Sequence, residues 1–221
     1  MRDELTIADV DHDGAIAEAR EGLATTRGQL FRRAGLIAGG GLVAAGVPIA
    51  FAGAQGGALS KGDVKILNYA LTLEYLEAAF YAEANAKGKL KGIAATFAQV
   101  VGAHEAAHVA ALEKALGSQA VKKPSFDFKG TTGSEKTFLA TAKTLEDTGV
   151  SAYQGQAGNI KAAPVLATAG SILAVEARHA AWVRDILGAG KDPVPAPEAF
   201  STPKSMSQVL TAVKSTGFLK A

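Results

Sequence analysis

The chain has 221 residues, no cysteine, 48% hydrophobic residues and a formal net charge of +2. This length fits one domain of ordinary size, alone or with appended segments. The lack of cysteine excludes disulfides, a cysteine nucleophile, thiolate zinc sites and cysteine-held iron–sulfur clusters. The small net charge, together with an aromatic content of 6%, argues against nucleic-acid binding.

Residues 1–54 have the pattern of an export signal. A polar, acidic stretch over residues 1–24 precedes a basic segment with the pair Arg32-Arg33, and residues 34–54 carry no charge. Small residues at the end of that stretch supply cleavage sites, and the adjacent arginines indicate the twin-arginine route, which exports folded proteins. We therefore expect the protein in the periplasm, in the cell envelope or outside the cell. The alternative is an uncleaved membrane anchor, in which membrane contact is confined to residues 34–54.

From residue 55 onward the apolar residues recur at three- and four-residue spacing, which is typical of helices that bury one face. No segment shows a two-residue period, so the predicted fold class is all-α. Residues 55–190 predict a four-helix bundle, and the proline-containing tail at 191–221 predicts irregular chain with one short helix near 204–216. We expect the long helices to begin after Ser60-Lys61-Gly62-Asp63 and near Leu90, Ser134 and Pro164, and to end at Gly88, Gly117, Gly155 and Gly188.

The body contains an internal repeat of two helix pairs. In each half, a helix with a glutamate and a tyrosine precedes a helix with a Glu-x-x-His motif. The glutamate precedes that motif by 31 residues in the first half and by 30 in the second. The aligned residues are Glu74 with Glu146, Tyr81 with Tyr153, Glu105 with Glu176, His108 with His179, and Gly117 with Gly188.

The spacing of these residues predicts a metal site inside the bundle. Residues three apart share a helix face, so the glutamate and histidine of each Glu-x-x-His motif can bind one metal ion together. Glu74 and Glu146 face the same core, and a tyrosine follows each of them two turns later, about 10 Å along the axis. Four buried carboxylates require cations, and two divalent ions neutralise them. Oxygen-rich ligands with some imidazole suit iron or manganese.

With this pattern, the chain resembles the ferritin-like superfamily of di-iron and di-manganese proteins. The segment 71–81, LTLEYLEAAFY, is similar to the exported branch that includes desiccation-related proteins. Members of the ferritin-like superfamily oxidise ferrous iron, reduce dioxygen or peroxide, or disproportionate peroxide at manganese. The resemblance therefore implies redox chemistry at a metal pair. It also implies terminal ligands Glu74 and Glu146, bridging ligands Glu105 and Glu176, and histidine ligands His108 and His179.

Some of these assignments have alternatives. Glu77 lies on the same helix as Glu74 and could replace it as a ligand. The repeat places Gly149 opposite Glu77, which favours Glu74. Tyr81 and Tyr153 are our candidates for catalytic residues, as hydrogen-bond donors to the carboxylates; the alternative is that they only fill the core.

Two other classes of function are compatible with parts of the pattern. The run His104-Glu105-Ala106-Ala107-His108 has the His-Glu-x-x-His spacing of zinc metalloproteases, in which the glutamate is the general base. In that case the second Glu-x-x-His is a coincidence, and a third zinc ligand is still needed. The other class is a non-enzymatic protein that protects the envelope or acts as a scaffold, with a structural metal pair.

The sequence therefore predicts an exported ferritin-like bundle with two iron or two manganese ions per chain. The predicted activity is redox work on ferrous iron, dioxygen or peroxide, of the ferroxidase or catalase-like kind. Metal ions and small oxygen species are the expected partners, and the expected oligomeric state is a monomer or homodimer. Residues 55–221 hold 18 basic and 14 acidic side chains, which argues against a mineral-storing shell with an acidic inner wall.

Overall fold

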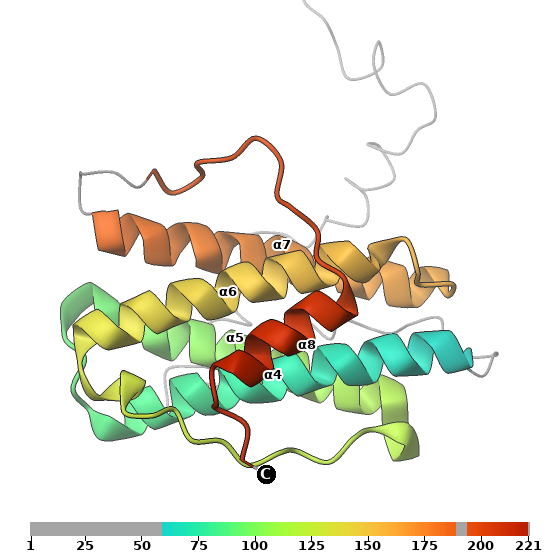
Figure 1. Cartoon of the computed structure of the whole chain (residues 1–221), viewed down its shortest axis with the longest axis horizontal. Helices are drawn as coiled ribbons and strands as arrows, with labels where there is room; N and C mark the ends of the chain where they lie inside the picture. The colour runs from blue at the N-terminus through green and yellow to red at the C-terminus, as the bar shows by residue number, and fades with distance from the viewer. Residues whose placement is uncertain (1–58, 189–193, 221) are drawn as a thin grey trace, which may run out of the picture. The chain divides into compact units, whose positions relative to one another are not determined.

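The computed structural model describes residues 59–188 and 194–220, which fold into four long helices and one short helix (Figure 1). The leader predicted over residues 1–54 lies outside the described residues. The described part of the chain contains no strand; Phe126 and Leu219 form an isolated antiparallel bridge. The helices are α4 (Lys61–Lys87), α5 (Gly92–Leu116), α6 (Glu135–Ala157), α7 (Ala163–Gly188) and α8 (Met206–Ser215), with 3₁₀ turns η1 (Gly117–Gln119) and η2 (Thr131–Gly133).

The long helices pack in two pairs, α4 with α5 and α6 with α7. Contacts of α4 with α6 and of α5 with α7 join the pairs, and α8 lies against α6 (Figure 1). The all-α four-helix bundle expected from the apolar periodicity is therefore confirmed, together with the short helix of the tail.

The N-terminus of α4 ties the two helix pairs together. The Ser60 hydroxyl accepts a hydrogen bond from the backbone N–H of Asp63, at 3.0 Å, as an N-cap does. The Asp63 carboxylate accepts from the N–H groups of Lys161 and Ala162, at 2.8 and 3.3 Å, just before α7. Ser60 thus caps α4, and Asp63 anchors the loop that leads into α7.

Helix α6 continues past Gly155, where the sequence predicted its end, and stops at Ala157. The tail explains the glycine, because a side chain at position 155 would collide with the carbonyl oxygen of Lys204. The Lys204 N–H also donates to the carbonyl oxygen of Ser151 at 3.0 Å. Gly155 therefore marks the close approach of the tail to α6 rather than a helix end.

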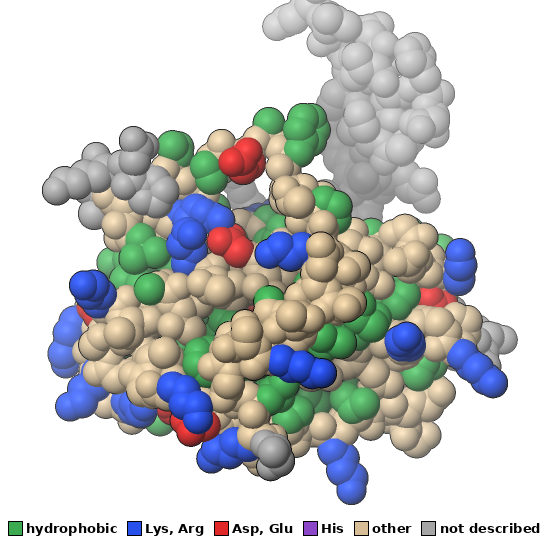
Figure 2. All heavy atoms as spheres, viewed as in Figure 1, with side chains coloured by type: hydrophobic (Ala, Val, Ile, Leu, Met, Phe, Trp, Pro, Cys, Tyr) green, Lys and Arg blue, Asp and Glu red, His purple; other side chains and the backbone are tan. Residues whose placement is uncertain are grey.

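Two apolar clusters fill the bundle. One contains the stacked and edge-to-face rings of Phe80, Phe97 and Phe138, and the other is built around Leu71 and Ile172. Lysine and arginine side chains are spread over the face shown in Figure 2, with few acidic ones among them. Within residues 59–188 and 194–220, no helix is long and apolar enough to cross a membrane.

Candidate metal centre

Four glutamates point into the middle of the bundle, one from each long helix. Each of them is fully buried, with 0% of its surface exposed, and both motif histidines are also buried. The helices place them there because each glutamate lies on the face of its helix that carries the apolar core residues. The four are Glu74 of α4, Glu105 of α5, Glu146 of α6 and Glu176 of α7.

These side chains form two groups that share two members. The first group is Glu74, Glu105, His108 and Glu176, and the second is Glu105, Glu146, Glu176 and His179. Within each group the candidate ligand atoms all lie within 4.8 Å of one another. The shared residues are the glutamates of the two Glu-x-x-His motifs, so they lie where ligands that bridge two ions are needed.

The distances show the same sharing. His108 Nδ1 lies 3.2 Å from Glu74 Oε2, 3.1 Å from Glu105 Oε2 and 3.3 Å from Glu176 Oε1. A single ring N–H cannot donate at full strength to three oxygens. His179 Nδ1 lies 3.1 Å from the other Glu105 oxygen, Oε1, and 3.2 Å from Glu146 Oε2. Carboxylate oxygens and an imidazole nitrogen this close to one another have the spacing of ligand atoms around a shared metal ion.

Burial makes this cluster electrostatically costly without cations. Burial and the neighbouring carboxylates raise the pKa of Glu105 and of Glu176 well above the usual range. Burial alone lowers the pKa of His108, but the close carboxylates of Glu105, Glu176 and Glu74 outweigh it and raise that pKa. Among the described residues, no lysine or arginine pairs with the four carboxylates.

Each of the two tyrosines hydrogen-bonds a glutamate from the other half of the repeat. The Tyr81 hydroxyl on α4 donates to Glu146 Oε1 on α6, and the Tyr153 hydroxyl on α6 donates to Glu74 Oε1 on α4. Burial, and then the charge of the carboxylate partner, raise the pKa of both phenols, so they keep their protons. Each tyrosine belongs to one of the two apolar clusters and also orients one carboxylate.

The residues fit a pair of divalent ions. Glu105 Oε1 and both Glu176 oxygens are buried and have no hydrogen-bond partner within the described residues. Leaving buried acceptors unpaired costs about 1–3 kcal/mol each. Two divalent ions supply the four positive charges and the missing partners, and a mixed carboxylate and imidazole set suits iron or manganese.

Glu77 is also buried at this centre, with 3% of its surface exposed, although neither group of candidate ligands includes it. Burial, followed by the charges of Glu176 and Glu146, raises its pKa well above the usual range. Gly149 lies opposite: a Cβ there would be 2.5 Å from Glu176 Oε2 and 3.5 Å from Glu77 Oε1. The sequence showed that the two positions align but not that both carboxylates crowd against the glycine.

His104 contacts the centre from outside. Its Nδ1 lies 2.9 Å from Nε2 of His179, and the two rings stack with centroids 5.2 Å apart. The His179 ring thus presents Nε2 to His104 and Nδ1 to the carboxylates. The candidate ligand groups contain His108 but not His104. The geometry therefore favours a dinuclear site over a protease site held by both histidines of the His-Glu-x-x-His run.

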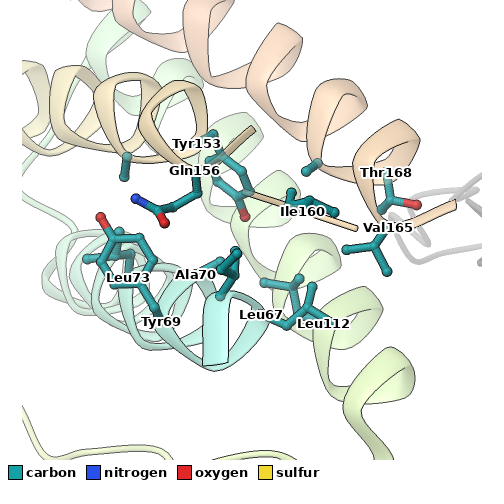
Figure 3. Close-up of a pocket in the computed structure, with 13 residues that line it drawn as sticks. Leu67, Tyr69, Ala70, Leu73, Leu112, Tyr153, Gln156, Ile160, Val165 and Thr168 are labelled. Atoms are coloured by element: carbon teal, nitrogen blue, oxygen red, sulfur yellow. The ribbon is translucent and has the colours of Figure 1, made fainter. Parts of the chain in front are cut away.

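An apolar cavity of 20 Å³ lies beside the centre. Figure 3 shows Tyr69 and Ala70 of α4 opposite Tyr153 and Gln156 of α6 in its lining. Tyr153 borders this cavity and also donates to Glu74, so its ring separates the cavity from the carboxylates. The space is large enough for one small molecule.

A comparison with protein families matches residues 62–189 to the ferritin-like domain family. The match covers more than half of the chain, all four long helices and the six candidate ligands. The chain therefore belongs to this family, and its buried Glu and His groups are fit for a dinuclear metal site. A search of curated proteins gave no match.

Proposed function

We propose that the protein binds two iron or two manganese ions per chain and uses them for redox chemistry on ferrous iron, dioxygen or peroxide. The observation that carries this proposal is the pair of buried Glu and His groups that share Glu105 and Glu176. When bound, such a metal pair supplies one-electron changes between the divalent and trivalent states. Glu74, Glu146, His108 and His179 complete the proposed ligand set.

The surrounding residues hold these ligands and exclude water. Tyr81 and Tyr153 orient the terminal carboxylates from opposite halves, and His104 orients the ring of His179. One oxygen of Glu105 and both oxygens of Glu176 have no hydrogen-bond partner among the described residues, so these carboxylates would be free to change how they hold the ions as the charge at the centre changes. The apolar cavity beside Tyr153 supports dioxygen as an oxidant, because a small apolar molecule fits there.

Elemental analysis of the purified protein is the first test, followed by optical spectra on adding ferrous iron and then peroxide. We expect two iron or two manganese atoms per chain and absorption bands that grow on oxidation. One zinc ion per chain contradicts the proposal and favours the protease alternative. Two ions that keep their oxidation state under air and peroxide favour the structural role instead.

We also propose that the protein is exported and belongs to the exported branch with desiccation-related proteins. The leader pattern of residues 1–54 and the segment 71–81 support this assignment. N-terminal sequencing of protein recovered outside the cytoplasm tests it. We expect a new N-terminus after Ala52 or Ala54; an intact leader in a membrane fraction favours the anchor.

A further inference from the structure

The two halves of the repeat are not equivalent at Glu77. Its aligned position in the second half is Gly149, and the absence of a side chain there lets the Glu176 carboxylate lie directly against α6, close to Glu77. Glycine inside a helix costs about 0.5–1 kcal/mol relative to alanine. At this position the cost has a clear reason, because any side chain would press against Glu176 Oε2.

A cavity of 40 Å³ at the seam between α4, α6 and α8 reaches Glu77 and Gly149. Its inner wall includes Glu77 and Gly149, and its outer rim includes the exposed Thr144 of α6 and Ala212 of α8. The lining residues of α6 therefore range from exposed Thr144 through half-buried Thr148 to buried Leu145 and Gly149.

The hydroxyl groups along this path present oxygen lone pairs. Thr144 donates its proton to the carbonyl oxygen of Ala140, and Thr148 donates to that of Thr144. Thr216, at the end of α8, donates to the carbonyl oxygen of Val213. Since these protons are engaged with the backbone, the threonine oxygens among the lining residues act only as acceptors toward a cation or its water shell, although that of Thr216 already accepts from the Phe218 N–H. The other lining residues besides Glu77 and Gly149 are apolar.

The innermost groups are two carboxylates. Glu77 Oε1 and Glu176 Oε2 both face Gly149, and Glu176 Oε2 is fully buried without a hydrogen-bond partner within the described residues. Glu176 is also one of the two carboxylates common to both candidate ligand groups. A cation held between Glu77 and Glu176 is therefore one step from the centre.

We propose that this passage is the route by which divalent cations enter, with Glu77 as a transit ligand that passes the ion to Glu176. The inference rests on the dinuclear centre proposed above and adds how that centre is filled. Glu77 is then needed for the rate of metal uptake and not for the final number of bound ions. The rim residue Ala212 controls the width of the passage without touching a carboxylate.

Stopped-flow uptake of cobalt(II) by the metal-free, full-length protein tests the proposal, with bound metal counted at equilibrium. We expect Glu77→Gln to slow uptake at least tenfold while the final content stays at two ions. Ala212→Leu, which narrows the exposed mouth, should slow uptake at least threefold. Matched controls that should fill at the wild-type rate are Glu83→Gln on α4 and Thr211→Leu on α8, both outside the cavity lining.

The outcomes separate the passage from the centre itself. Uptake by Glu77→Gln at the wild-type rate overturns the proposal, as does wild-type uptake by Ala212→Leu. A final content below two ions in Glu77→Gln also overturns it, because Glu77 is then a ligand of the centre. Wild-type protein that binds no cobalt at equilibrium contradicts the proposed dinuclear function, which is a different failure.

Discussion

The helix pair α4–α5 and the pair α6–α7 carry the same side chains at the centre but different side chains around it. Glu74, His108 and their repeat partners occupy equivalent places. In contrast, Glu77 of the first pair faces Gly149 of the second. Exposed His104 of the first pair contacts His179, and the aligned position in the second pair is Val175.

This difference separates two requirements of a buried metal site. Charge neutralisation demands the same ligand set from both halves, because each ion needs its own carboxylates and imidazole. Access and support are needed once for the whole centre, so one half can supply the proposed transit carboxylate and the other the glycine beside it. On the proposed function, the repeated residues would hold the ions, and the residues that depart from the repeat would serve access and support.

The largest expected effect comes from removing the shared ligands of both halves. Glu105→Ala combined with Glu176→Ala should reduce the metal content from two ions per chain to none, because both groups lose their common members. Elemental analysis after incubation with excess iron or manganese measures this. Asp185→Ala, an exposed carboxylate on α7, is the matched control and should retain both ions. Two ions bound to the double variant would contradict the site.

Metal removal should lower the stability of the whole bundle. Without cations, the four carboxylates face each other and three of their oxygens lack partners. Each ion present at a hundred times its Kd adds about 2.7 kcal/mol, or about 5–10 °C in Tm for a chain of this size, so two ions add about twice as much. Calorimetry with and without chelator measures the shift. The Glu105 and Glu176 double variant should show no shift, and an equal shift in that variant would locate the bound metal elsewhere.

Changing Gly149 tests the asymmetry directly. Gly149→Ala puts a methyl group 2.5 Å from Glu176 Oε2, so the shared carboxylate must move. We expect metal affinity to fall by about 10–100-fold, the range typical of changes next to a ligand. Gly170→Ala on α7 is the matched control, since its Cβ meets nothing within 4 Å. Competition titration measures both, and equal affinities for the two variants would refute the crowding argument.

Much of the fold could be predicted because helices have a fixed period. The three- and four-residue spacing of the apolar residues was enough to predict four helices, and the two Glu-x-x-His motifs with the preceding glutamates predicted a shared site in their interior. The partners across the bundle could not be predicted this way, since they depend on how closely helices approach. Tyr81 bonds Glu146 of α6 rather than Glu74 of its own helix, and Gly155 accommodates the tail instead of ending α6.

The smallest expected effects come from the two tyrosines, and they test whether the halves act equally. Tyr81→Phe and Tyr153→Phe each keep the ring in its apolar cluster and remove one hydrogen bond to a terminal carboxylate. A hydrogen bond to a charged group contributes about 1.5–3 kcal/mol, and part of this is recovered when the carboxylate binds the ion alone. We therefore expect metal affinity to fall about tenfold in each variant and by similar amounts in both.

Tyr69→Phe is the control for these two variants, because the Tyr69 hydroxyl is buried and has no hydrogen-bond partner among the described residues. Its removal should leave metal affinity unchanged, in the same competition titration. A much larger loss for Tyr153→Phe than for Tyr81→Phe would show that the two ions are bound unequally. Tyr153 donates to Glu74 and also borders the apolar cavity. Such a result would therefore show that the ion nearest Glu74, on the cavity side of the centre, depends more on its tyrosine than the other ion does.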